Sequence, residues 1–109
     1  MSERQAIAER RECDRFNFRH DGFLYTAAFS QYADGRLAEV FFQVAKSGTA
    51  LEAVTRDAAI LVSLCLQYGA SEEAIRHSLT RLENDEPAGP VARFLDVLAL
   101  GKRPRHEQA

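Results

Sequence analysis

The sequence has few of the residues that a metal site, a disulfide scaffold or a membrane span requires. Among its 109 residues are two cysteines, three histidines and no tryptophan, and no run of 18 or more apolar residues occurs. Cys13 and Cys65 are too far apart for a Cys-x-x-Cys pair, and no histidine has a second ligand at metal spacing. We therefore expect a cytoplasmic protein with no metal, no cofactor and no membrane contact.

The chain also lacks an excess of charge of one sign. It has 14 basic and 16 acidic residues and a formal net charge of -2, so no global field attracts nucleic acid or an anionic membrane. The basic stretch near the C-terminus has no interleaved aromatic residues, which argues against a nucleic-acid partner. The length is that of one domain with a substantial core.

Apolar periodicity and turn residues divide this domain into six elements. We predict strands at about 15–19, 23–32 and 37–45 and helices at about 50–68, 72–82 and 90–100. The strands form an antiparallel meander and the helices pack on one face of it, which is an α+β fold. Residues 1–14 are predicted to be a flexible polar arm, 15–101 a single domain, and 102–109 a flexible charged tail.

A hairpin is predicted around Asp34-Gly35, because this dipeptide favours a two-residue type I′ turn. The turn would pair Ala33 with Arg36 and place Phe29 opposite Val40. All the inner-facing positions are then apolar: Tyr25, Ala27, Phe29, Val40, Phe42 and Val44.

The outer face of the same hairpin is predicted to be mostly polar and solvated, with Ser30 opposite Glu39 and Thr26 opposite Gln43. Phe41 is the exception on this face. Two interpretations are open for it: the N-terminal arm covers the ring, or the ring belongs to a surface for self-association.

The corner between the third strand and the first helix, Lys46-Ser47-Gly48-Thr49, is also open to two interpretations. Free backbone N–H groups at a helix start and the charge of Lys46 could bind a phosphate or a nucleotide, although the P-loop spacing is absent. Alternatively, the corner is a structural joint, with Thr49 and Glu52 forming a capping box. Arg56 and Asp57 follow about one turn later, either on a solvated surface or in ion pairs with Lys46, with Glu39 or with neighbours across the sheet edge.

The predicted binding residues, for an anion or a partner protein, are Lys46, Ser47, Gly48, Thr49, Arg56 and Asp57.

The helix over 50–68 is predicted to be central and buried, because its second half carries no charge. Apolar residues recur at helical spacing in it: Leu51, Val54, Ala58, Leu61, Val62 and Cys65. Cys65 is accordingly expected in the core. The next helix is predicted to bury Ile75, Leu79 and Leu82.

The order of motifs over about 23–98 resembles the TSCPD domain family. The matching features are a strand with Glu39 and Phe41, a corner with Lys46 and Gly48, a Ser-Leu-x-Leu helix end closed by a glycine, and an Ile-x-x-x-Leu helix. The last two comprise Ser63, Leu64, Leu66, Gly69, Ile75 and Leu79.

The resemblance implies a bacterial-type module of deoxyribonucleotide metabolism. The family occurs at the C-terminus of vitamin B12-dependent ribonucleotide reductases, near cysteines that pass on reducing equivalents, and as stand-alone proteins. Here the region where the family's Cys-Pro-Asp segment would fall reads EPAGPVARFLDVL, and no cysteine follows Cys65. A dithiol relay needs two exposed thiols close enough to exchange, and the C-terminal region cannot supply such a pair, so we expect a non-catalytic domain.

The partners that this resemblance suggests are a ribonucleotide reductase subunit or another protein, and a nucleotide or phosphate. Two alternatives remain: a component of a ribonucleoside-diphosphate reductase that contributes Lys46, Arg56 or Cys13, and a homo-oligomeric module that uses Phe41.

Overall fold

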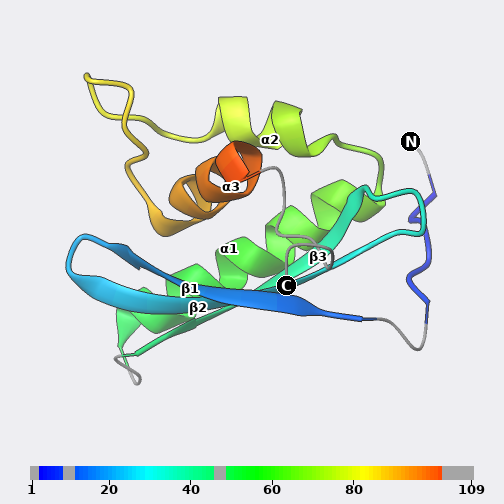
Figure 1. Cartoon of the computed structure of the whole chain (residues 1–109), viewed down its shortest axis with the longest axis horizontal. Coiled ribbons are helices and arrows are strands. Elements are labelled where there is room, and N and C mark those ends of the chain that lie inside the picture. The colour runs from blue at the N-terminus through cyan, green and yellow to red at the C-terminus, as the bar shows by residue number, and fades with distance from the viewer. Residues whose placement is uncertain (1–2, 9–11, 46–48, 102–109) are drawn as a thin grey trace.

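The computed structural model describes residues 3–8, 12–45 and 49–101 of the chain. Its three strands form one antiparallel sheet in the order β1-β2-β3, and three helices follow in sequence. In Figure 1 the helices lie on one side of the sheet, so the predicted α+β fold is confirmed. The elements are β1 (Asp14–His20), β2 (Phe23–Gln31), β3 (Leu37–Val44), α1 (Ala50–Gln67), α2 (Glu72–Ser78) and α3 (Pro90–Gly101).

The two Asp-Gly turns of the sheet differ from each other, and the second differs from the prediction. Asp21 and Gly22 have φ values of 53° and 81°, which is the pattern of a type I′ turn, and they join β1 to β2. Gly35 has a φ of 93°, whereas Asp34 keeps a negative φ. The prediction of a type I′ turn at Asp34-Gly35 is therefore wrong. The β2–β3 connection is a three-residue loop whose last residue, Gly35, is left-handed.

A β-bulge compensates for the longer loop and restores the predicted register. Gln31 lies opposite Leu37, whereas Ser30 lies opposite Glu39, so Ala38 is the extra residue. The loop and the bulge shift the register in opposite directions by one residue. As a result the predicted pairs from Ser30 onwards are confirmed, and all six predicted inner positions are buried.

Phe94 of α3 lies at the centre of the core. Its ring centroid is 5.1 Å from that of Phe42, 5.5 Å from Phe16 and 5.8 Å from Phe29, and Phe94 has no exposed surface. These rings come from all three strands, so one side chain of α3 contacts the whole width of the sheet.

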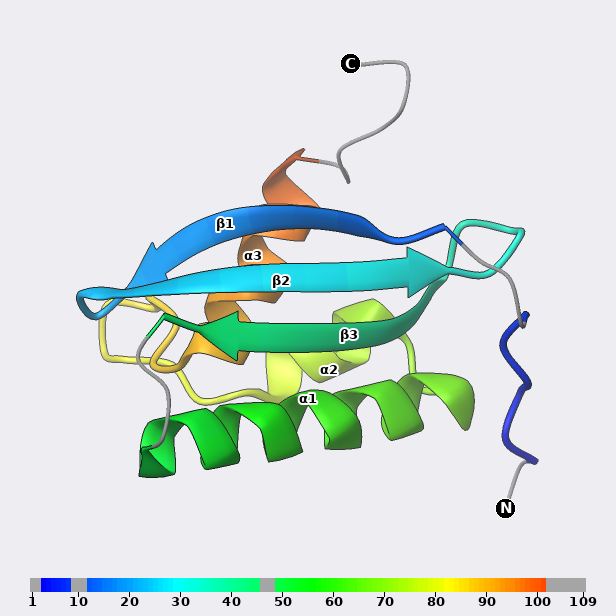
Figure 2. The ribbon, with the colours of Figure 1, turned by 90° about the horizontal axis from the view of Figure 1, so that it is seen from below.

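Helix α1 covers the free edge of β3. The Ser63 hydroxyl accepts a hydrogen bond from the Val40 N–H at 2.9 Å and donates to the Val40 carbonyl at 3.2 Å. Gln67 donates from Nε2 to the Ala38 carbonyl at 3.1 Å. Figure 2 shows α1 running beside β3 along most of its length. The backbone groups of an edge strand are thereby satisfied by side chains of a helix.

We expect Ser63→Ala to lower the free energy of unfolding by about 1–2 kcal/mol, because a partly buried N–H loses its acceptor. Urea denaturation of both variants measures this. Ser78→Ala is the control, since the Ser78 hydroxyl donates to the Ala74 carbonyl of its own helix on an exposed surface. Equal losses of unfolding free energy in Ser63→Ala and Ser78→Ala would contradict the role of the Ser63 hydroxyl in satisfying the edge of β3.

The prediction that α1 is buried on all sides is wrong. Val54 and Leu61 are 65% and 62% exposed, and Cys65 is an exposed free thiol rather than a core residue. A helix beside an edge strand buries one face only. That face consists of Thr55, Ala59, Val62, Leu66 and Gln67.

The helix ends follow the predicted capping signals. The Thr49 hydroxyl accepts a hydrogen bond from the Glu52 N–H at 3.3 Å, and Ser71 accepts one from Ala74 at 3.0 Å. Gly69 has a φ of 114°, as expected for a left-handed helix end.

Helix α2 is shorter than predicted, because it ends at Ser78 instead of about residue 82. Leu79 is extended, with a φ of -79° and a ψ of 158°, and Leu82 is 55% exposed rather than part of a buried stripe. The chain between Thr80 and Ala88 folds back on itself, with the Ala88 N–H donating to the Thr80 carbonyl at 3.1 Å.

An ion-pair cluster anchors this returning segment to α3. The Arg81 guanidinium donates to both carboxylate oxygens of Asp96 at 2.7 Å, and Arg76 donates to the same carboxylate at 2.8 Å. These hydrogen bonds, led by those from Arg81, lower the pKa of Asp96 to about 2. Asp96 thereby connects α2 and the segment after it to α3.

Candidate functional site

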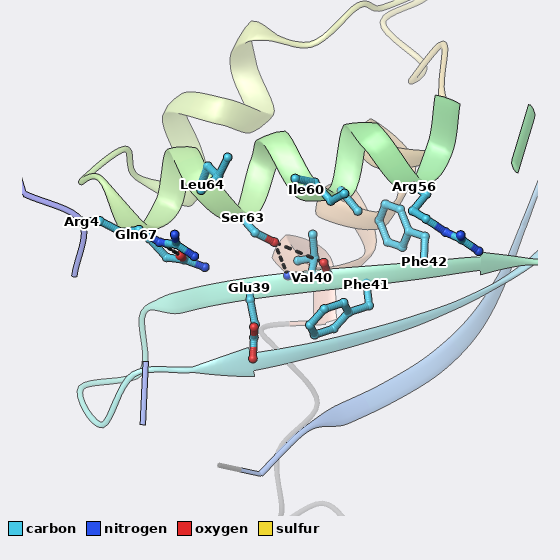
Figure 3. Close-up of a pocket in the computed structure, with 11 residues that line it drawn as sticks. Arg4, Glu39, Val40, Phe41, Phe42, Arg56, Ile60, Ser63, Leu64 and Gln67 are labelled. Carbon is cyan, nitrogen blue, oxygen red and sulfur yellow. Dashed lines mark hydrogen bonds between the residues drawn. The ribbon is translucent and has the colours of Figure 1, made fainter. Parts of the chain in front are cut away.

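A groove lies between α1 and the outer face of β3, with a volume of about 390 Å³. We call it the outer groove and define it by Arg4, Phe41, Arg56, Ile60, Ser63 and Leu64. Figure 3 shows its residues coming from β3, from α1 and from the N-terminal segment.

Apolar side chains line the middle of the outer groove. Phe41 is 48% exposed and Ile60 is 52% exposed, and Leu64 lies one turn after Ile60 on α1. Phe41 points outward because neighbouring residues of a strand alternate between faces, and Phe42 occupies the core side. The arrangement leaves an apolar surface open between a strand and a helix.

Arginines mark the two ends of this surface. Arg56 stands near the start of α1, and Arg4 donates to the Gln67 side chain at the end of α1, with Nε 2.6 Å from Oε1. Figure 3 shows the apolar side chains between them. Positions 56 and 67 are about 16 Å apart along the helix axis, from a rise of about 1.5 Å per residue. The outer groove is thus apolar in the middle and cationic at both ends.

The N-terminal segment is held at one end of the groove by several hydrogen bonds. The Gln5 N–H donates to the Gln67 carbonyl at 2.6 Å, and the Tyr32 hydroxyl donates to the Gln5 carbonyl at 3.0 Å. Arg36 also donates to the Gln5 side chain at 3.0 Å. These contacts place Arg4 next to α1.

A buried carboxylate lies in the wall of the groove. Glu39 is 5% exposed and accepts a hydrogen bond from the Ser30 hydroxyl at 2.8 Å. Ser30 is 2% exposed, so the prediction that this outer-face pair is solvated is wrong.

Of the six predicted binding residues, Arg56 lines the outer groove, where it lies together with Phe41, the predicted self-association residue. Thr49 is exposed, and its hydroxyl caps α1. Asp57 is also exposed and is not among the residues that line the outer groove. The remaining predicted residues, Lys46, Ser47 and Gly48, lie outside the described residues.

Four groove residues were not predicted to be binding residues: Arg4, Ile60, Ser63 and Leu64. The signal that could have indicated the apolar pair, Ile60 and Leu64, is the uncharged run AAILVSLCL, residues 58–66, because it has more apolar residues than one helix face can bury. No comparable signal marks Arg4, which reaches the groove through tertiary contacts.

Two further properties concern the described residues alone. Within 3–8, 12–45 and 49–101, no group of three or more His, Cys, Asp or Glu side chains is arranged to hold a metal ion. None of the helices in these ranges is long and apolar enough to cross a membrane.

Comparison with known proteins places the chain in a family. The model of the TSCPD domain matches residues 5–100. A vitamin B12-dependent ribonucleotide reductase of Bradyrhizobium diazoefficiens is 38% identical over 93 residues, which are 84% of this chain and 7% of that protein. The enzyme of the same name from Agrobacterium fabrum is 39% identical over 72 residues, which are 66% of this chain and 5% of that protein.

No solved structure matches the chain. The chain spans less than a tenth of the length of these two reductases. The family match covers most of the chain, including α1 and β3, which form the outer groove. This protein therefore belongs to the TSCPD domain family.

Proposed function

We propose that this protein is a non-catalytic docking module of deoxyribonucleotide metabolism that binds a vitamin B12-dependent ribonucleotide reductase. The observation that carries the proposal is the match of 84% of the chain to 7% of such a reductase. Because a domain of this family is a small part of such a reductase in the relatives, we expect this domain to contact the other parts of that enzyme.

The outer groove is the surface that we assign to the partner. Exposed Phe41 and Ile60 offer an apolar contact, and the arginines at the two ends offer charges to acidic side chains. The complementary partner segment carries apolar residues with an acidic residue on each side, separated by about 16 Å, the helix rise between positions 56 and 67. Binding of this kind weakens as salt concentration rises.

A nucleotide or phosphate at the corner before α1 is the alternative ligand. One contact favours the protein partner instead: the Thr49 hydroxyl already accepts a hydrogen bond from the Glu52 N–H and caps the helix. The alternative of a subunit that supplies a reacting group has no comparable support.

The test measures binding of the full chain to the Bradyrhizobium diazoefficiens reductase from which the matching segment has been deleted. We expect binding by isothermal titration calorimetry, and at least a tenfold loss of affinity in Ile60→Glu, because a charge would enter the apolar centre of the contact. Arg56→Glu should also weaken binding and reduce its dependence on salt.

Leu100→Glu is the matched control, because Leu100 is 84% exposed on α3 and lies outside the outer groove. Its affinity should equal that of the wild type. Failure of the wild-type chain to bind the truncated reductase would reject the proposed function, and unchanged binding by Ile60→Glu would reject the outer groove as the contact.

A further inference from the structure

The outer face of the sheet is open and carries a hollow of its own. Figure 2 shows the three strands in front and the helices behind or beside them. The strand register places Arg15 of β1, Ala28 of β2 and Phe41 of β3 side by side on this face. The hollow has a volume of about 300 Å³. We call it the sheet hollow and define it by Cys13, Arg15, Thr26, Ala28, Phe41 and Gln43.

The sizes of three neighbouring side chains produce the sheet hollow. Ala28 on the middle strand has only a methyl group, whereas Arg15 and Phe41 on the outer strands have long or large side chains. These two strands are about 10 Å apart, because neighbouring strands are about 4.8 Å apart. The volume lies at the lower end of the range for small-molecule sites, about 300–1,000 Å³. The sheet hollow therefore has room for one small ligand.

The charge of the sheet hollow favours an anion. Arg15 is exposed, and within the part of the chain that the structure describes, no hydrogen bond or ion pair involves its side chain. The strand segments around it, 15–19, 24–28 and 41–45, contain no acidic residue. The carboxylate of Glu39 in the adjacent row is buried and accepts a hydrogen bond from the Ser30 hydroxyl. The fork of the Arg15 guanidinium is thus available to a phosphate.

The opposite side of the sheet hollow favours a planar ring. Phe41 is 48% exposed, and an exposed aromatic ring is a surface on which a nucleic-acid base stacks. The next row of the sheet is polar: Thr26 lies opposite Gln43, and the Thr26 hydroxyl donates to Asn17 Oδ1 at 2.8 Å. The Gln43 amide is exposed and offers both a donor and an acceptor. A heterocycle with its own donors and acceptors matches this wall better than a plain hydrocarbon ring.

We infer that the sheet hollow binds a free nucleotide, with the base stacked on Phe41, the sugar over Ala28 and the phosphate on Arg15. A nucleoside monophosphate has its ring and its anion at opposite ends, as the two outer strands of the sheet present their binding groups. The site is separate from the corner before α1. Phe41 also lines the outer groove, so a bound nucleotide and a bound protein partner contact the same residue.

The two exposed thiols of the chain provide a footprint of the ligand. Cys13 lines the sheet hollow, whereas Cys65 lines the groove between α1 and α2. The full chain is labelled with N-ethylmaleimide in the presence of each common nucleoside monophosphate, and mass spectrometry measures the rate at each cysteine. At least one nucleotide should slow the labelling of Cys13 and leave that of Cys65 unchanged. No slowing at Cys13 by any of them, or equal slowing at both thiols, would overturn the inference.

Parts of the ligand test the two ends of the site separately. The corresponding nucleoside lacks the phosphate and ribose phosphate lacks the base, so each should protect Cys13 only at a concentration about tenfold higher than the nucleotide. Equal protection by ribose phosphate and by the nucleotide would reject the contact with Phe41. A single-stranded oligothymidylate that protects at a lower concentration than every monophosphate would assign the face to nucleic acid and overturn the free nucleotide as the ligand.

Variants of the open face test the assigned residues. Arg15→Ala should raise the nucleotide concentration for half-protection about tenfold, because the phosphate loses its charged donor. Arg19→Ala is the matched control, since Arg19 is exposed on the same face of β1 but does not line the sheet hollow. Ala28→Leu should abolish protection by filling the hollow at unchanged charge, with a native circular dichroism spectrum. Wild-type protection in Arg15→Ala or in Ala28→Leu, or an equal loss in Arg19→Ala, would overturn the inference.

Discussion

Phe94→Ala should remove a large part of the stability of this domain. The variant leaves a cavity at the point where aromatic rings from all three strands meet α3, with Phe42 only 5.1 Å away between ring centroids. Truncation of a buried phenylalanine costs about 3–5 kcal/mol, because apolar contacts are lost and the cavity refills only in part. The total free energy of unfolding of a domain of this size is about 5–15 kcal/mol.

Thermal unfolding followed by circular dichroism measures this loss. The melting temperature should fall by about 12–40 °C, from about 4–8 °C per kcal/mol in a domain of this size. Phe94→Leu should lose much less, because it keeps most of the volume.

Leu100→Ala on the same helix is the control for helix propensity and position, because Leu100 is 84% exposed. It should melt within a few degrees of the wild type. A Phe94→Ala protein that melts close to Leu100→Ala would show that the aromatic cluster is not the centre of the core.

Asp96→Asn should have the second-largest effect: we expect the free energy of unfolding to fall by about 2 kcal/mol at neutral pH. Two arginines donate hydrogen bonds to this carboxylate, and its side chain is only 22% exposed, so solvent screens the interaction little. The variant leaves Arg76 and Arg81 without their shared anion and loosens the segment after α2.

The effect of Asp96→Asn should depend on pH in a defined direction. The folded protein lowers the pKa of Asp96 from 3.8 to about 2. A lowered pKa means that the carboxylate stabilises the folded state above about pH 4 and that this contribution is lost as the pH falls towards 2. Urea denaturation from about pH 7 to about pH 2.5 should show the two proteins converging in stability.

Asp34→Asn is a matched control for this pH series. Asp34 also has a lowered pKa, chiefly because the Arg36 backbone N–H and side chain donate to it, but it lies exposed in the hairpin loop. At neutral pH, Asp34→Asn should lower the free energy of unfolding much less than Asp96→Asn does. A difference between wild type and Asp96→Asn that stays constant over the whole pH range would reject the role of the charge.

The order, type and approximate bounds of the elements could be predicted from the sequence because they depend on local signals. Alternation of apolar residues in β2 and β3 identified the inner face, and Thr49, Gly69 and Ser71 marked helix ends through caps made by neighbouring residues. The predicted end of the second helix was wrong for the opposite reason. Arg81 contacts Asp96, fifteen residues away, and the chain turns to make that contact.

The candidate site could be predicted only in part. Arg56 and Phe41 were both identified, but separately, as part of a binding corner and as a self-association surface. Their meeting in one groove depends on α1 lying beside β3, which the Ser63 and Gln67 hydrogen bonds maintain. Arg4 joins them through its contact with Gln67, sixty-three residues away.

By itself the sequence determined the α+β fold, the sheet order implied by successive hairpins, and which residues are apolar enough to be buried. Only the tertiary structure decided which of those apolar residues are in fact covered. Hydrophobicity measures the gain from leaving water, but a side chain leaves water only where another surface meets it. Because α1 packs against a strand edge on one face, Val62 is buried while Leu61 and Cys65 remain exposed.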